Sequence, residues 1–222
     1  MKKFLAVLSA VVVLVTIINN VHYRLGWFID FNPGGEVTTF VKAEDKKIYI
    51  NKGEGYEPFE IKGVNMGSGE PGQWSTDFAI DKDTYIRWFG YIKEMGANTI
   101  RIYTVQQDIF YEALYEYNKD NKDPLYVIHG VWVNDYIQNS HRDAYDKDFY
   151  NRFLKDCKTM IDVVHGQKKL SLSSMASAGH GNYRKDISQW VIGYILGVEW
   201  EDITVAYTDD TYAGNRKYTE YK

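Results

Sequence analysis

The stretch MGANTIRIYT, residues 95–104, decides the fold of this 222-residue chain. Gly96 ends a helical pattern, and the apolar and β-branched run at residues 99–104 that follows has the length of a buried strand. A helix that stops at a glycine just before such a strand is typical of βα units built on a parallel sheet. Arg101 stands inside this strand, and we expect a carboxylate partner near it because an unpaired buried guanidinium is strongly destabilising.

The same alternation of strand and helix patterns continues on both sides of this stretch. Apolar runs of strand length predict further strands at residues 59–66, 125–132 and 191–199. Apolar residues at helical spacing predict helices at residues 83–95, 107–117 and 148–164. Cys157, on the apolar face of the last helix, is expected in the core.

The spacing of the predicted strand ends favours a (β/α)8 barrel. Asn65, Tyr103 and His129 follow one another at intervals of roughly 30 residues, the length of one unit in such a barrel. A longer interval before Glu199 holds two loops, at residues 133–147 and 166–186, and the second has no periodicity, so we expect a mobile surface loop there. The predicted fold class is α/β: a partial (β/α)8 TIM barrel of about four βα units, preceded by a β-hairpin and an N-terminal hydrophobic helix.

The N-terminus has the pattern of a targeting segment. Two lysines precede an apolar run at residues 4–18 that only Ser9 and Thr16 interrupt, and no small-x-small cleavage site follows. We therefore predict a signal-anchor at residues 1–30 that makes the membrane a partner and places the rest of the chain at the extracytoplasmic face of the cell membrane. A cleaved signal peptide and a secreted protein are the alternative. Residues 31–58 are predicted as linker and hairpin, and residues 59–222 as the barrel domain.

Composition excludes some functions and leaves others open. The net charge of −4 argues against a polybasic nucleic-acid binder, and one cysteine cannot form an internal disulfide. Aromatic residues make up 16% of the chain, which suits sugar-stacking surfaces and an ordinary aromatic core equally. The chain has no phosphate-binding loop, no H-E-x-x-H and no C-x-x-C, so we expect neither a metal nor a cofactor.

Glu199 is the strongest candidate for chemistry. It closes an apolar strand and would lie on the rim where barrel enzymes build their active sites, so its carboxyl could act as an acid. The alternative is that Glu199 begins a solvated loop. The carboxylate that we expect beside Arg101 is either a catalytic group or the partner of Arg101 in a structural salt bridge at a strand end.

Other polar and aromatic residues lie at or beside the predicted strand ends. Asn65 and His129 could bind ligand hydroxyls, although a lone histidine is more often a satisfied polar group in the core. Flat aromatic side chains in these positions could form platforms for pyranose rings, although each alone could be packing: Trp74, Tyr103, Trp132 and Trp200.

Three segments together resemble the first four strands of the retaining (β/α)8 glycoside hydrolases, a superfamily that includes family 2 β-galactosidases, β-mannanases and β-1,3-glucanosyltransferases. They are FEIKGVNM at residues 59–66, MGANTIRIY at 95–103 and WVIGYILGVEW at 190–200. The resemblance implies that the substrate is a β-linked polysaccharide or oligosaccharide. It also implies that Glu199 is the general acid/base and that Arg101 contacts the nucleophile.

Two features depart from that superfamily. Val198 stands where its members place the asparagine that binds the sugar 2-hydroxyl. Their nucleophile comes from the seventh strand, and the residues after Glu199 are too few to form four further βα units, so we expect the N-terminal half of a longer enzyme, inactive alone. A non-catalytic glycan-binding or scaffold protein remains an alternative, and a serine hydrolase using Ser68 with His129 lacks the nucleophile elbow.

Overall fold

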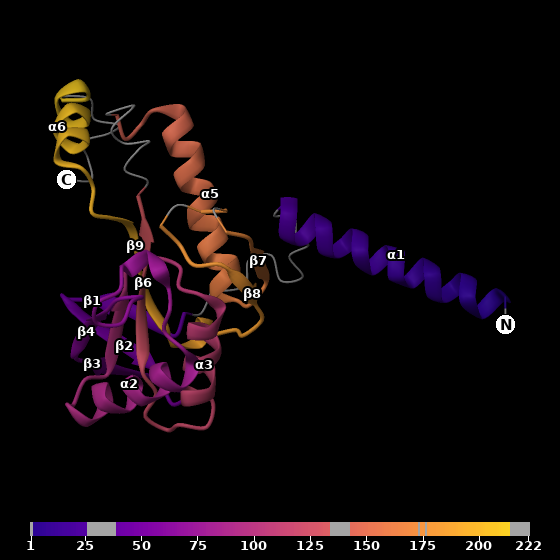
Figure 1. Cartoon of the computed structure of the whole chain (residues 1–222), viewed down its shortest axis with the longest axis horizontal. Helices are drawn as coiled ribbons and strands as arrows, with labels where there is room; N and C mark the ends of the chain where they lie inside the picture. Colours follow the sequence, from indigo (N-terminus) through magenta and orange to yellow (C-terminus); the bar gives the residue numbers. More distant parts are fainter. Residues whose placement is uncertain (1, 26–38, 134–142, 173, 176, 214–222) are drawn as a thin grey trace. The chain divides into compact units, whose positions relative to one another are not determined.

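The computed structural model describes residues 2–25, 39–133, 143–172, 174–175 and 177–213. The chain divides into two compact units, residues 1–39 and residues 40–222, which we describe separately. The first unit contains helix α1 (Lys2–Leu25). The second contains the sheets and the remaining helices (Figure 1).

The predicted membrane anchor at residues 1–30 is wrong, and with it the predicted location at the cell membrane. In the described part of the chain, no helix combines the length and the apolar character needed to cross a membrane. The apolar run of α1 is bounded by Lys3 and Asn19. At 1.5 Å per residue it would extend over about 22 Å, whereas the hydrocarbon core of a bilayer is about 30 Å thick.

An antiparallel sheet begins the second unit. Its strands β1 (Val41–Glu44), β2 (Lys47–Asn51) and β3 (Tyr56–Phe59) are paired in chain order. Asp45 and Lys46 both have positive φ, 48° and 61°, which matches the two-residue turn that follows the twist of a hairpin.

The strand predicted at residues 59–66 is two strands in the structure, β3 and the separate β4 (Gly63–Met66). Asn98 holds the break between them. Its side-chain amide donates to the Glu60 carbonyl at 2.8 Å, and its side-chain oxygen accepts from the Lys62 amide at 2.9 Å. These contacts connect residues far apart in the sequence, so the local apolar pattern could not reveal the break.

Four parallel strands form the central sheet, in agreement with the predicted α/β class. After β4 come β5 (Thr99–Ile102), β6 (Tyr126–Trp132) and β9 (Val191–Val198), and the order across the sheet is the order along the chain. Gly130 allows this close pairing, since a Cβ there would lie 2.6 Å from the Tyr103 carbonyl oxygen.

Helices connect these strands close to the predicted positions. They are α2 (Lys82–Glu94), α3 (Asp108–Asn118) and α5 (Lys147–Val164), and α6 (Asp202–Thr211) follows the last strand. The Asp81 carboxylate caps α2 by accepting from the Thr84 amide at 2.7 Å, and Gly96, with φ of 85°, follows its C-terminus.

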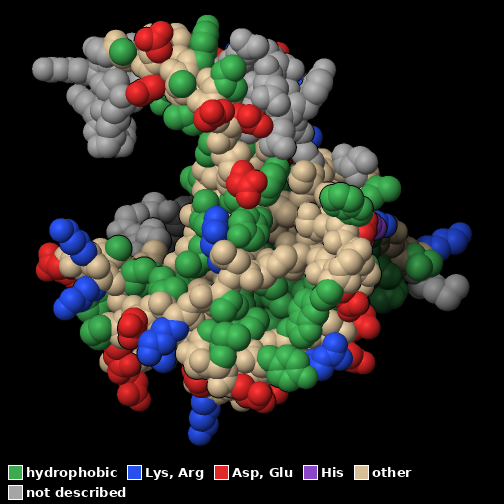
Figure 2. Space-filling view, turned by 60° about the vertical axis from the view of Figure 1, so that its left-hand side comes forward, with side chains coloured by type: hydrophobic (Ala, Val, Ile, Leu, Met, Phe, Trp, Pro, Cys, Tyr) green, Lys and Arg blue, Asp and Glu red, His purple; other side chains and the backbone are tan. Residues whose placement is uncertain are grey.

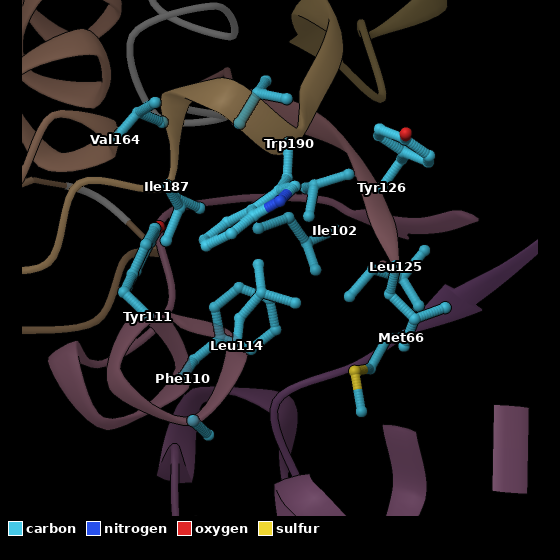
Figure 3. Close-up of a cluster of buried hydrophobic side chains, with 14 of the residues drawn as sticks. Met66, Ile102, Phe110, Tyr111, Leu114, Leu125, Tyr126, Val164, Ile187 and Trp190 are labelled. Carbon is cyan, nitrogen blue, oxygen red and sulfur yellow. The ribbon is translucent and has the colours of Figure 1, made fainter. Parts of the chain in front are cut away.

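The core lies between the sheet and these helices. Ile100 and Ile102 of β5 are fully buried, and Figure 3 shows Phe110 and Leu114 of α3 pointing toward Ile102 and Trp190. The alternate residues of β5, Arg101 among them, are on the opposite face, and Arg101 is only half-buried. Around Arg101, therefore, this face of the sheet is less completely covered than the face that packs on α3.

The region predicted as a mobile loop, residues 166–186, contains an ordered strand pair. Strands β7 (Lys168–Leu170) and β8 (Gly181–Tyr183) are antiparallel. The Asp108 carboxylate at the start of α3 accepts from the Asn182 amide at 2.7 Å, and the Tyr183 hydroxyl donates to the Gln106 carbonyl at 2.7 Å. These contacts anchor the strand pair to the segment that follows β5. Of the other predicted loop, at residues 133–147, most lies outside the described residues.

Candidate functional site

A pocket of about 370 Å³ lies at the carboxyl ends of the parallel strands. Met66 of β4 and Trp132 of β6 line it, together with Tyr103 just after β5 and Glu199 just after β9. Ligands of parallel α/β sheets bind beyond the carboxyl ends of the strands, so this is the position where the fold is suited to bind one.

The loop after β4 forms one wall of the pocket and is held by its own hydrogen bonds. The Ser68 hydroxyl donates to the Ser75 carbonyl, and the Trp74 amide donates to the Asp77 carboxylate at 2.8 Å. Ser75 and Thr76 line the pocket, and the neighbouring Trp74 side chain is 80% exposed. The loop therefore presents a large aromatic surface to solvent beside the pocket.

The end of β9 places Glu199 at the rim of the pocket. Gly197 has φ of 89° and Glu199 has φ of 57°, so the backbone departs from strand geometry on both sides of the buried Val198. Trp200 packs on α5, with ring centroids 5.5 Å from Phe149 and 5.7 Å from Phe153. Glu199 is thus held between the buried Val198 and the half-buried Trp200, while its own side chain is exposed.

Backbone strain is concentrated around this pocket. Among the described residues, five that are not glycine have left-handed φ values. Asp45 and Lys46 form the β1–β2 turn, and the other three, Phe78, Ser177 and Glu199, all line the pocket. Left-handed backbone is costly for side chains with a Cβ and is found preferentially at functional sites.

Arg101 lies outside the residues that line the pocket, beneath one that does. Its guanidinium carbon is 4.6 Å from the centre of the Tyr103 ring, and its terminal nitrogen donates to the Asn65 side chain at 3.4 Å. Within the described residues no carboxylate forms an ion pair with Arg101, and its Nε is buried without a hydrogen-bond partner. The expected carboxylate partner is therefore absent from that part of the chain.

His129 is fully buried and does not line the pocket. Its Nε2 accepts from the Tyr111 hydroxyl at 2.7 Å, which leaves Nδ1 to donate to the Gly130 carbonyl at 3.0 Å. Burial lowers the pKa of His129 to about 4 and raises the pKa of Tyr111 well above its usual value, so both are neutral at pH 7. Because His129 and Ser68 have other partners, they form no nucleophile and base pair.

The structure thus brings together some of the predicted site residues. Glu199, Tyr103 and Trp132 meet in one pocket, and Trp74 belongs to its wall loop. The Trp200 ring packs on α5, while Asn65, Arg101 and His129 are not part of the lining. In the segments that the structure describes, no three His, Cys, Asp or Glu side chains are grouped as metal ligands would be.

Sequence reasoning missed five polar lining residues, which are Ser75, Thr76, Thr104, Gln106 and Ser177. Thr104 ends the strand predicted at residues 99–104 and Gln106 lies just after it, and polar residues at such an end are a usable signal. Ser177 lies in an aperiodic segment that gave no such signal. The lining includes one charged side chain, Glu199, and its remaining polar groups are neutral.

The face of the molecule in Figure 2 carries acidic side chains at its top and both acidic and basic side chains along its left and lower margins, and hydrophobic and uncharged side chains occupy most of its middle. Comparisons with family models, with curated proteins and with solved structures found no match to this chain.

Proposed function

We propose that the pocket binds a β-linked polysaccharide or oligosaccharide, and that this chain supplies the general acid/base residue of a retaining glycoside hydrolase or transglycosylase. The observation that carries the proposal is the meeting of Glu199, Tyr103 and Trp132, from the ends of three strands, in one pocket. Aromatic faces suit the apolar faces of pyranose rings, and a carboxyl group protonates the glycosidic oxygen in such enzymes.

The strand order supports assigning the sheet to the first half of a (β/α)8 barrel. In a doubly wound sheet the order reverses at a switch point, and helices cover both faces. Here each successive strand, from β4 through β5 and β6 to β9, is added on the same side of the previous one. Their inner face, with Arg101 and Tyr103, is only partly buried, as expected for the interior of an incompletely closed barrel.

A second candidate function is glycan binding without cleavage, and two observations favour it. Retaining hydrolysis needs two carboxyl groups about 5–5.5 Å apart, and among the described residues that line the pocket Glu199 is the only carboxylate. The Val198 side chain, in the position of the family asparagine, is 2% exposed and cannot contact a sugar hydroxyl. Both functions share the same ligand and the same pocket.

Titration calorimetry with laminaritetraose, cellotetraose and mannotetraose tests the shared proposal, and 4-nitrophenyl β-glycosides test turnover. Binding by the wild type that Trp132→Ala weakens supports glycan recognition in this pocket. Turnover that Glu199→Gln abolishes while leaving binding in place supports hydrolysis. Binding with no turnover is the result expected both of the second candidate and of an acid/base half that lacks its nucleophile, and the absence of binding to all three oligosaccharides contradicts both.

A further inference from the structure

Gln106 carries an unused hydrogen-bond acceptor in the wall of the pocket. The residue is 2% exposed and lines the pocket, and its Oε1 has no hydrogen-bond partner. Its Nε2 donates to the Thr104 carbonyl at 3.2 Å, which orients the carboxamide. The Thr104 hydroxyl, in the same lining, also has no partner although Thr104 is only 6% exposed.

The backbone of Gln106 is fixed from several sides. Its amide donates to the Tyr111 hydroxyl at 3.3 Å, and its carbonyl accepts from the Tyr183 hydroxyl at 2.7 Å. Gly179 packs against the peptide between residues 106 and 107 so closely that a Cβ on Gly179 would overlap it. The fold therefore holds Gln106 in place and still leaves its side-chain oxygen unpaired.

An unpaired buried acceptor destabilises a folded protein, and most such groups in native structures have a partner. In a pocket wall that partner can be a donor on a ligand. The charges of the pocket further limit the chemical class of the ligand, because the described lining has one carboxylate, Glu199, and neither lysine nor arginine. Such a lining accepts hydrogen bonds from hydroxyls and repels anionic groups.

We propose that Gln106 is a specificity-determining residue, whose Oε1 accepts a hydrogen bond from a hydroxyl of a neutral glycan. The Thr104 hydroxyl binds a second polar group of the same sugar, and acidic glycans are rejected. This inference rests on the proposed glycan function and adds which residue recognises the ligand and that the ligand is uncharged. A site built to pair a ligand hydroxyl discriminates strongly against ligands that cannot supply one.

The test uses Gln106→Met, which keeps nearly the same length but has no amide oxygen. Gln107→Met is the matched control, since Gln107 is the neighbouring residue, makes no side-chain capping bond to α3 and does not line the pocket. Calorimetric titration with the three neutral tetrasaccharides and with tetragalacturonate gives Kd, and thermal unfolding gives Tm.

For Gln106→Met we expect Kd for the neutral ligand to rise at least about tenfold, with Tm no lower than that of the control. An unchanged Kd overturns the inference, and a Tm below that of Gln107→Met also overturns it, because the carboxamide would then be structural. Tetragalacturonate binding as tightly as the neutral ligands overturns the predicted ligand class. If the wild type binds none of these oligosaccharides, the proposed function itself fails, which distinguishes that outcome from the others.

Discussion

Acid should destabilise the folded protein through one buried side chain, His129. Its ring lies fully buried between the Tyr111 hydroxyl and the Gly130 carbonyl, and burial lowers its pKa from the ordinary 6.5 to about 4. Between these pH values the unfolded chain binds a proton at His129 that the folded protein does not. The stability contributed by the neutral ring is therefore complete above pH 6.5 and is lost as the pH falls toward 4.

The size of this effect follows from the change in pKa. Each unit corresponds to about 1.4 kcal/mol, so protonation of the unfolded state lowers the free energy of unfolding by about 3 kcal/mol across this window. Asp156 acts in the opposite direction, because burial raises the pKa of its carboxyl to about 6 and favours the folded, protonated form below that pH. The total pH dependence therefore combines both groups, and a variant is needed to separate them.

His129→Gln provides that separation, because a glutamine oxygen can accept from the Tyr111 hydroxyl and does not titrate. Urea unfolding of the wild type and the variant at several pH values between 7.5 and 4.5 gives the free energy of unfolding of each. We expect the wild type to lose up to about 3 kcal/mol relative to the variant as the pH falls. Asp156→Asn is the control and should steepen the loss in the wild-type background. Parallel curves for wild type and His129→Gln would refute the reasoning.

Two further substitutions test local features by urea unfolding. Gly197→Ala should destabilise the protein by about 1–3 kcal/mol, because φ of Gly197 is 89° and the new Cβ would overlap the Trp200 indole. The control is Gly90→Ala, which lies within α2 with open space around it and should stabilise the protein by about 0.5–1 kcal/mol. Equal effects of the two substitutions would contradict the requirement for glycine at residue 197. Asp81→Ala should cost about 1 kcal/mol through loss of the bond to the Thr84 amide, and an unchanged free energy of unfolding would show that the cap contributes nothing.

Features set by neighbouring residues could be predicted from the sequence. Asp81 and Gly96 mark the ends of α2 because a cap and a left-handed C-terminal residue act within one helical turn. Three strands of the parallel sheet, β5, β6 and β9, could also be predicted, because a buried strand appears in the sequence as a continuous apolar run. The break between β3 and β4 was not predictable, because it depends on Asn98, which is 38 residues from Glu60.

The candidate site shows the same division. Glu199, Tyr103 and Trp132 could be proposed because each stands at or beside the end of an apolar strand. The role of Gln106 could not, because its burial depends on Tyr183, which is 77 residues away in a segment without periodicity. Arg101 gave a misleading signal, since its place in an apolar strand suggested a carboxylate partner that the described residues do not provide.

Two independent costs coincide at the pocket, and their coincidence is a stronger argument for a ligand than either alone. The pocket is lined by Phe78, Ser177 and Glu199, which are the left-handed residues other than glycine outside the β1–β2 turn in the described chain. It is also lined by Thr104 and Gln106, which carry two of the four buried side-chain polar atoms that have no hydrogen-bond partner among the described residues. Folding alone would favour relaxing both, because strained backbone and unpaired buried acceptors each lower stability. The hydrogen bonds that the Gln106 backbone makes with the Tyr111 and Tyr183 hydroxyls instead hold the arrangement in place before any ligand arrives. A pocket held in this way does not need to reorganise when a ligand binds. A ligand hydroxyl that pairs with Gln106 therefore binds more tightly, because the free energy of placing the unpaired Oε1 in the pocket wall is spent during folding and not during binding.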